Sequence, residues 1–243
     1  MPTISEVLQS SKQLTKANIK PLLILQLAPL LGIIIFGLLG FVLSESGGIF
    51  KVLFGLLAIP MVVAFMYVSF LVALATDVLI LHRIDNKDTS LKQIIELSQK
   101  KLLRYLGASI LYVLGVLGGL LLLVIPGIYF AVKYIFVFPL IADTDMKVKE
   151  SFTEAARMTK GKLWFVGKFI LAFIGIGIFV TIISNLLGSV SESLNFIVGN
   201  IASLLLGIFI SVALVVLYRS LKTNAAAPVI TTADTPVTTN PVV

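Results

Sequence analysis

The stretch VIPGIYFAVKYIFVFP, residues Val124–Pro139, decides how the chain folds. It overlaps a run without charged residues from Tyr105 to Val132, which is too long for one ordinary membrane helix and short for two. A single helix, a kinked helix and the turn of a hairpin would place the later loops on different sides of a membrane. The orientation of every later segment therefore depends on the structure at Pro126 and Gly127.

The composition predicts an integral membrane protein. The 243 residues are 58% hydrophobic and 13% charged, with a mean hydropathy of +1.07, whereas soluble domains are about half apolar and a quarter charged. The sequence has no cysteine and one histidine, which excludes disulfides, thiol catalysis and metal sites built on cysteines or several histidines. The first apolar run begins only at Pro21, without a cleavage pattern after it, so we expect no cleaved signal peptide.

Six segments are long and apolar enough to cross a bilayer, whose hydrocarbon core of about 30 Å requires roughly twenty helical residues. We expect spans at about 21–43, 52–80, 102–125, 127–142, 163–187 and 194–218. The sequence therefore predicts an all-α, polytopic membrane domain over residues 1–222, with six transmembrane helices in three hairpins. The segment 223–243, rich in Thr, Pro and Ala, is predicted to be a disordered cytoplasmic tail.

The distribution of basic residues favours a hairpin turn at Pro126 and Gly127. With that turn, sixteen of the 19 Lys and Arg residues flank the spans on one side, and one, Lys51, lies on the other. A single helix would move the five basic residues of 147–162 to the opposite side. Because basic loops stay in the cytoplasm, we expect both termini to be cytoplasmic. Proline also suits the first turn of a helix, and glycine tolerates turn geometry.

Three basic amphipathic segments, 3–19, 90–103 and 147–161, each precede a pair of spans. Apolar side chains recur in them near helical spacing, so we expect three helices at the cytoplasmic membrane surface. The lysines predicted to contact anionic lipid headgroups are Lys12, Lys16, Lys100, Lys101, Lys160 and Lys162. These flanking positions explain the net charge of +7, so we expect no binding to nucleic acid.

Three charged side chains, Asp77, Lys133 and Lys168, are predicted to lie within spans. Charges inside a membrane are costly and mark structural or functional sites. The favoured interpretation is an ion pair that orders the bundle, formed by Asp77 with Lys168 or with the flexible Lys133 side chain. An ion or proton site in a transporter is the alternative. Asn185 and Asn200 are expected to hydrogen-bond across helices.

Small residues recur at a spacing of four in two of the spans. The third span carries one such pair, and the last span carries a longer stripe: Gly115 and Gly119, then Gly199, Ser203, Gly207 and Ser211. Small side chains allow helices to approach closely. We expect these positions to pack within the bundle, and a homodimer face is the alternative.

A short pattern in the second half of the chain carries a family likeness. IPGIY at 125–129 is followed by Lys133, Pro139 and Asp143, and then by SFTEAARMTKGKLW at 151–164. The pattern resembles the membrane-domain family found in some glycerophosphoryl diester phosphodiesterases, and the related YciC-like membrane proteins. The resemblance implies a prokaryotic protein of the cytoplasmic membrane. The soluble catalytic barrel of those phosphodiesterases has no counterpart in this sequence.

No phosphate loop, nucleophile elbow or metal-ligand spacing occurs in the sequence. General acid–base catalysis usually needs two or more placed titratable groups, and the spans offer one acid. The sequence therefore predicts a membrane protein without a catalytic site or cofactor, acting as an accessory that binds lipid or a membrane-protein partner. A small transporter or channel that uses Asp77, Lys133 and Lys168 is the alternative.

The predicted topology can be tested with reporter fusions in intact cells. Alkaline phosphatase, which is active only outside the cytoplasm, should be active when it is fused after Gly127 or Ser191. The same enzyme fused after Lys160 should be silent, because the basic segment 147–162 is expected to stay inside. The reverse pattern of activities would contradict the topology.

Overall fold

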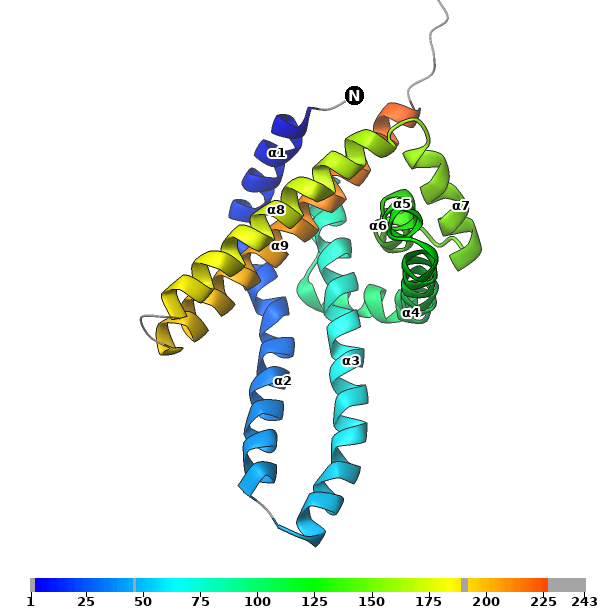
Figure 1. Cartoon of the computed structure of the whole chain (residues 1–243). Coiled ribbons are helices and arrows are strands. Elements are labelled where there is room, and N and C mark those ends of the chain that lie inside the picture. Colours follow the sequence, from blue (N-terminus) through cyan, green and yellow to red (C-terminus); the bar gives the residue numbers. More distant parts are fainter. Residues whose placement is uncertain (1–2, 46, 189–191, 227–243) are drawn as a thin grey trace, which may run out of the picture.

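The fold is all-helical in a computed structural model that describes residues 3–45, 47–188 and 192–226 (Figure 1). Within these residues there are nine α-helices and no strand. The helices are α1 (Ile4–Ala17), α2 (Ile19–Glu45), α3 (Ile49–Ile84), α4 (Leu91–Leu122), α5 (Val124–Tyr134), α6 (Val137–Asp143), α7 (Val148–Thr159), α8 (Leu163–Gly188) and α9 (Glu192–Ala226). The all-α class predicted from the sequence is confirmed.

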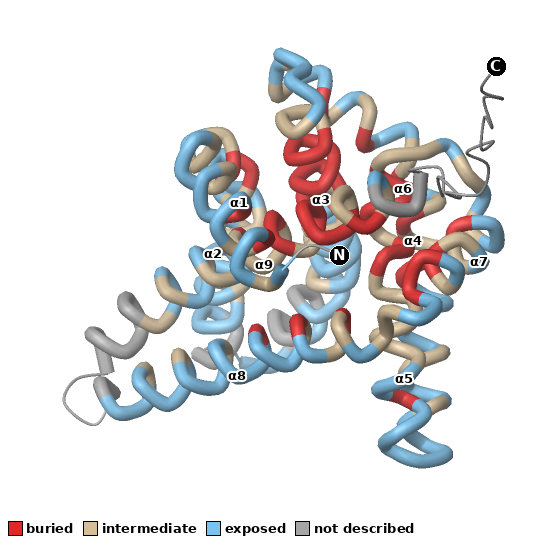
Figure 2. Tube along the Cα trace, turned by 90° about the horizontal axis from the view of Figure 1, so that it is seen from above, coloured by how far each residue is buried: buried red, intermediate tan, exposed pale blue. Residues whose placement is uncertain are grey.

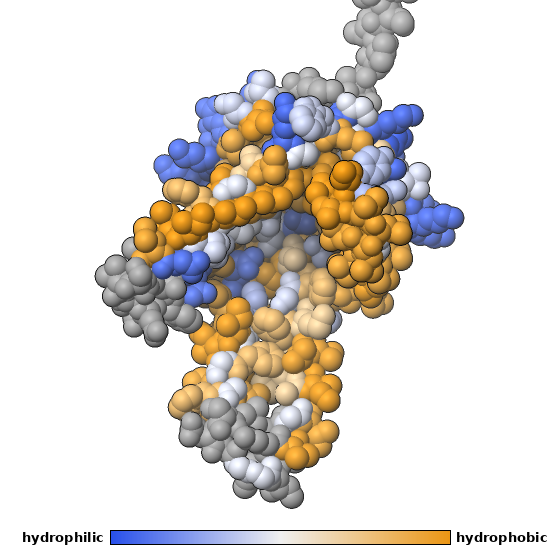
Figure 3. Space-filling view, in the orientation of Figure 1, coloured by the Kyte–Doolittle hydropathy of each residue, from blue (hydrophilic) through white to orange (hydrophobic). Residues whose placement is uncertain are grey.

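Six helical segments of the described chain are long and apolar enough to cross a membrane. They are Ile19–Val42, Gly55–Ile84, Leu91–Leu122, Val124–Asp143, Leu163–Leu186 and Gly199–Thr223. Many of their large apolar side chains are exposed. Figure 3 shows this apolar surface over the long helices, whereas hydrophilic residues gather around α1, α7 and the C-terminal part of α9, which we name the polar end. Because so much exposed apolar surface requires lipid around it, the protein is a multi-pass membrane protein.

Two helices, α1 and α4, begin with side-chain caps. In α1 the Thr3 hydroxyl accepts a hydrogen bond from the Glu6 N–H (3.2 Å), and the Glu6 carboxylate accepts one from the Thr3 N–H (2.9 Å). Ser90 and Gln93 form the same box at the start of α4. These bonds satisfy N–H groups that have no partner inside the helix. The caps thus fix where the two helices start.

Two predicted boundaries differ from the structure. The segment 90–103 is not a separate surface helix, because α4 continues from Leu91 through it to Leu122. It contains no glycine or proline, so nothing in its backbone ends the helix. α9 likewise continues to Ala226, past the predicted start of the tail at 223, because alanines favour helix. The rest of the predicted tail, 227–243, lies outside the described residues.

The link between α4 and α5 is a single residue, Leu123, in extended backbone (φ −167°, ψ 150°). Pro126 and Gly127 lie in the first turn of α5 and do not form the corner itself, so the predicted turn position is wrong by three residues. The first N–H groups of a helix have no partner within it, so a proline there removes no helix bond. α4 and α5 pack directly against each other.

Glycines permit the close contact between these two helices. A Cβ atom at Gly119 would lie 2.7 Å from the Cα of Gly127, and one at Gly127 would lie 2.8 Å from the backbone nitrogen of Leu120. A Cβ atom at Gly115 would overlap the ring of Phe130. Gly115 and Gly119 of α4 therefore pack against α5 of the same chain.

The short helix α6 lies at the centre of the core. It is separated from α5 by a break at Ile135 and Phe136, so the predicted fourth span, 127–142, is not one continuous helix. α6 contacts α3, α4, α7 and α9, and its residues Val137, Leu140 and Ile141 are buried. Figure 2 shows the buried positions gathered where these helices meet, and exposed positions along much of α5 and α8. Broken helices are tolerated at membrane depth when protein surrounds them.

Replacing Gly119 with alanine should destabilise the protein, because the added Cβ forces α4 away from α5. Overpacking of this kind costs about 1–3 kcal/mol. Gly118 is the matched control, since a Cβ there would have no atom within 4 Å; Gly118→Ala should be neutral or slightly stabilising through helix propensity. Thermal unfolding in detergent micelles compares the two variants. Equal midpoints would contradict the close contact.

Candidate functional site

Asp77 does not form the ion pair predicted for it. The residue lies on α3 and is 7% exposed. Among the residues that the structure describes, no ion pair or hydrogen bond reaches its carboxyl group. Burial without a partner is unfavourable for a carboxyl group. Asp77 therefore needs a hydrogen bond or a counter-charge that the described residues do not supply.

The two lysines predicted to pair with Asp77 lie against aromatic rings. The Lys133 ammonium is 5.3 Å from the ring centroid of Tyr129 and 5.4 Å from that of Tyr134. The Lys168 ammonium is 5.2 Å from the ring of Trp164. Cation–π contacts stabilise a lysine while its long stem carries the charge toward the membrane surface. The predicted ion pair is therefore wrong, and the three charged residues do not form one site.

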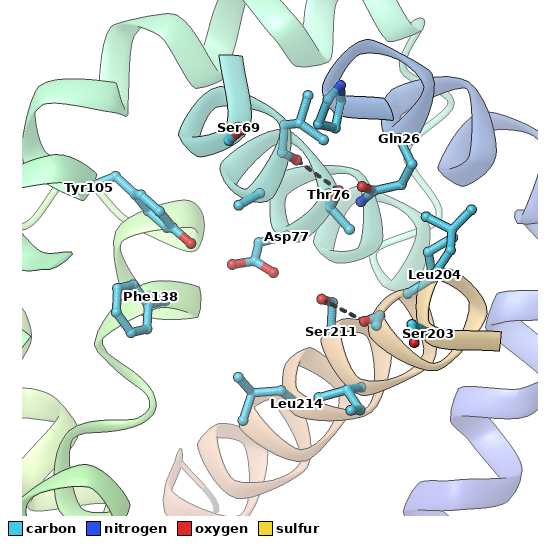
Figure 4. A pocket seen from close by; sticks show the side chains of 16 residues that line it. Gln26, Ser69, Thr76, Asp77, Tyr105, Phe138, Ser203, Leu204, Ser211 and Leu214 are labelled. Carbon is cyan, nitrogen blue, oxygen red and sulfur yellow. Dashed lines mark hydrogen bonds between the residues drawn. The ribbon is translucent and has the colours of Figure 1, made fainter. Parts of the chain in front are cut away.

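Asp77 faces a cavity of about 450 Å³ that is lined from α2, α3, α4, α6 and α9. Figure 4 shows its carboxyl group pointing into the open space, with Tyr105 and Phe138 on one side and Ser211 on another. The polar side chains that line the cavity beside Asp77 are Gln26, Ser69, Thr76, Tyr105, Ser203 and Ser211. We name this space the Asp77 cavity.

The small-residue stripe of α9 borders this cavity. Ser203, Gly207 and Ser211 line it, and a Cβ atom at Gly207 would have no atom within 4 Å. The expectation of a close helix contact is thus wrong at Gly207, because the small side chains leave space unfilled. Sequence reasoning missed the cavity, since the same spacing fits a close contact.

The predicted asparagine positions lie away from this cavity. Asn185 and Asn200 are both exposed, on α8 and α9. Gly199, the first residue of the stripe, is half-buried and does not line the cavity. The hydrogen bonds expected from the two asparagines across helices stay a prediction.

A second cavity, of about 500 Å³, lies between α5, α7 and the turn before α8. We name it the basic recess, because Lys133, Arg157 and Lys160 line it. The Thr159 hydroxyl donates to the Lys133 carbonyl oxygen at 3.0 Å, which ties the end of α7 to α5. Gly161 has a φ of +75°, a conformation that glycine adopts readily. The turn at Gly161 thus lets α8 begin beside the recess.

The basic side chains of the recess differ in their partners. Arg157 bonds to Glu154 through both carboxylate oxygens, at 2.7 and 2.8 Å, and this hydrogen bonding lowers the pKa of Glu154 below its ordinary value. Lys160 is exposed and has no partner in the described part of the chain. The Lys133 ammonium lies beside Tyr129 and Tyr134, and no acid of the described residues forms an ion pair with it. Lys133 and Lys160 can therefore bind an anionic ligand without first breaking an ion pair with an acidic side chain.

The other lysines predicted to meet lipid fall into two groups. Lys12, Lys16 and Lys100 are exposed, and Lys162 is half-buried. Lys101 is already occupied, as its ammonium donates to two carbonyl oxygens at the end of α6, at 2.8 and 3.2 Å. The last carbonyls of a helix have no partners within it, so a lysine bonds well there. Two donors of Lys101 are thus used within the protein, and its contact with a lipid headgroup stays a prediction.

Asp143, the last residue of α6, joins three side chains of α9. Its carboxylate accepts hydrogen bonds from the Tyr218 hydroxyl (2.7 Å), the Arg219 guanidinium (3.3 Å) and the Lys222 ammonium. Arg219 also pairs with Asp85, just after α3. We name these five residues the Asp143 clamp. It fastens α3, α6 and α9 to one another at the polar end.

The second half of the chain matches a known family model. Residues 113–230 match the family model of the membrane domain of glycerophosphoryl diester phosphodiesterase. The resemblance found in the sequence is confirmed over this range, which is slightly less than half of the chain. The match is to the membrane domain of that family and not to its catalytic domain. No curated protein and no solved structure matches the chain.

The matched range contains all of the basic recess and only part of the Asp77 cavity. It contains α5 to α8 with the whole basic recess, and it contains the α9 residues of the Asp143 clamp. Asp77 and Tyr105 lie before it. The basic recess is therefore a feature of the segment shared with the family, and the Asp77 cavity is built partly outside it.

Replacing Asp143 with asparagine should destabilise the protein, because Arg219 and Lys222 lose the acid that they share. The carboxylate is 12% exposed, and we expect a loss of roughly 1–3 kcal/mol. Asp88→Asn is the control, since this side chain is 99% exposed and pairs only with Arg83; it should change stability by about 0.5 kcal/mol or less. Thermal unfolding in micelles measures both. Equal losses would contradict the clamp.

Proposed function

We propose that the protein is a lipid-binding accessory protein of the cytoplasmic membrane, and that it holds the phosphate of an anionic lipid in the basic recess. It has no catalytic site of its own in this proposal. The observation that carries the proposal is the basic recess itself, a cavity of about 500 Å³ bordered by Lys133, Arg157 and Lys160. Lysine and arginine are the side chains that bind phosphate oxygens best.

The chemistry of the recess suits a lipid headgroup. Lys160 and Lys133 bring positive charge without an acid in contact, and the Thr153 side chain adds a hydroxyl group at the border. Tyr129 and Leu163 supply apolar surface beside them. A ligand with a phosphate and an attached apolar chain would satisfy both parts of this lining.

The position of the recess also supports a headgroup. It lies where the polar helix α7 meets the start of the apolar helix α8. Near this junction Trp164 is 77% exposed, and Lys168 lies over its ring. Exposed tryptophan and lysine side chains at the end of a span are typical of the membrane–water interface. Lipid phosphates occupy this level of a bilayer.

The orientation of the protein follows from its charges. Basic residues occur in α1, in α7 and in the C-terminal part of α9, and Figure 3 shows hydrophilic surface over these segments. The positive-inside rule then places the polar end and both termini in the cytoplasm, with the pairs α2–α3, α4–α5 and α8–α9 in the membrane. Anionic lipids of the cytoplasmic leaflet face such basic surfaces.

A transporter or channel that uses Asp77, Lys133 and Lys168 has less support. Ion or proton transfer between these residues requires that they meet or share a path. The two lysines contact aromatic rings, and neither forms an ion pair with Asp77. The lipid-binding role needs only the recess, where the cations already lie together.

Lipid binding can be measured by native mass spectrometry with phosphatidylglycerol. Each lysine near a headgroup contributes about 1 kcal/mol, so the double variant Lys133→Gln with Lys160→Gln should bind about tenfold more weakly or worse. The matched control is Lys92→Gln with Lys149→Gln, which removes the same charge from exposed positions outside the recess. The control should bind as the unchanged protein does.

Phosphatidylcholine is the lipid control, and its binding should be similar in all three proteins. Equal losses of phosphatidylglycerol in the two double variants would mean that only overall charge matters, which would contradict a site in the recess. Competition by inorganic phosphate without any effect of the acyl chains would show that the recess binds a free anion instead of a lipid.

A further inference from the structure

The Asp77 cavity holds a carboxyl group that the protein leaves without a partner. Asp77 is more than nine-tenths buried and points into the open space, as Figure 4 shows. Burying a carboxyl group without a hydrogen bond or counter-charge costs free energy. No side chain among the described residues supplies either. A ligand that carries both a positive charge and hydrogen-bond donors would supply the counter-charge and the hydrogen bond.

The charge of the lining selects the kind of ligand. Among the described residues that line the cavity, Asp77 is the one that can carry a charge, and none is a lysine or arginine. A phosphate or carboxylate group would therefore find no cation there, and would be repelled by the acid. The lining disfavours anionic ligands, and it favours a cation that carries a single positive charge.

The size and walls of the cavity favour an organic cation over a bare ion. Its volume of about 450 Å³ falls in the usual range for small-molecule sites, roughly 300–1,000 Å³. Metal binding needs several acids or histidines together, and no such group of three occurs in the described chain. Apolar and aromatic side chains also line the cavity, among them Phe138, Ile208 and Leu214. Such walls would hold the body of an organic molecule.

The aromatic residues lie where they can help to bind the charge. Tyr105 and Phe138 stand on one side of the Asp77 carboxyl group, and their ring centroids are 5.3 Å apart. Aromatic faces attract organic ammonium ions. The hydroxyl groups of Ser69, Ser203 and Thr76 line the same cavity and can accept hydrogen bonds from N–H donors.

We propose that the Asp77 cavity binds an organic ammonium ion with an apolar or aromatic body, whose N–H groups donate to the Asp77 carboxylate. The body then lies against Phe138 and the apolar residues of α9. This site is separate from the basic recess and does not depend on lipid binding there. In Figure 3 the surface is hollowed beside the oblique α8–α9 pair, next to α2 and α3.

The test uses 2-phenylethylammonium, a cation with an aromatic body, and the full chain in nanodiscs of phosphatidylcholine. Equilibrium dialysis measures binding, with empty nanodiscs subtracted. The unchanged protein should show one saturable site. Asp77→Asn should weaken binding at least tenfold, whereas Asp88→Asn, which removes the same charge from an exposed loop position, should not. The neutral analogue 2-phenylethanol should not distinguish Asp77→Asn from the unchanged protein.

A second variant keeps the acid and fills the space. Gly207→Leu extends a side chain into the open part of the cavity, so it should also weaken amine binding at least tenfold while the protein stays folded. If Asp77→Asn does not fold, amine binding to Gly207→Leu tests whether the Asp77 cavity is the binding site. Equal amine binding to Gly207→Leu and to the unchanged protein would overturn the proposal. Absence of amine binding to the unchanged protein, or saturable binding of sodium alone, would overturn it as well.

Discussion

The fold depends on one carboxylate, that of Asp143, which accepts from Tyr218, Arg219 and Lys222. In lipid, apolar contacts alone discriminate poorly between helix arrangements, because lipid tails are as apolar as the helices. A charged acceptor at the end of α6 that must meet three donors on α9 removes this ambiguity. Since α6 is buried against α3, α4 and α7 as well, fixing its end also fixes the helices around it.

The sequence was informative about single helices and much less about how they meet. Apolar run length predicts the spans because the bilayer thickness fixes it. The sequence did not reveal that the basic segment 90–103 and the third span form one helix. Both parts of α4 favour helix, and no residue between them ends it. Pro126 and Gly127 marked the start of α5, yet the corner itself needed only Leu123, which has no turn signature.

The candidate sites could be predicted only in part, because depth along a helix does not give rotation about its axis. Asp77 and Lys168 are predicted to lie at similar depths, but they face different neighbours. The aromatic partners of the lysines were within reach of sequence reasoning, since Lys133 follows Tyr129 and Lys168 follows Trp164 by four residues. The partners of Asp143 lie 75 to 79 residues away along the chain, so no local sequence pattern could predict them.

The contact between α1 and α9 links the first and last helices of the described residues. α9 also packs against α3, α6, α7 and α8, so five earlier helices share a partner that the ribosome makes after them. Until α9 enters the membrane, Asp143 and Asp85 have no arginine or lysine from it, and the core beside α6 stays open. Final closure of this protein is therefore a late event in biogenesis. A chain released before α9 would expose Asp85 and Asp143, without their partners from α9, to the quality-control proteases of the membrane.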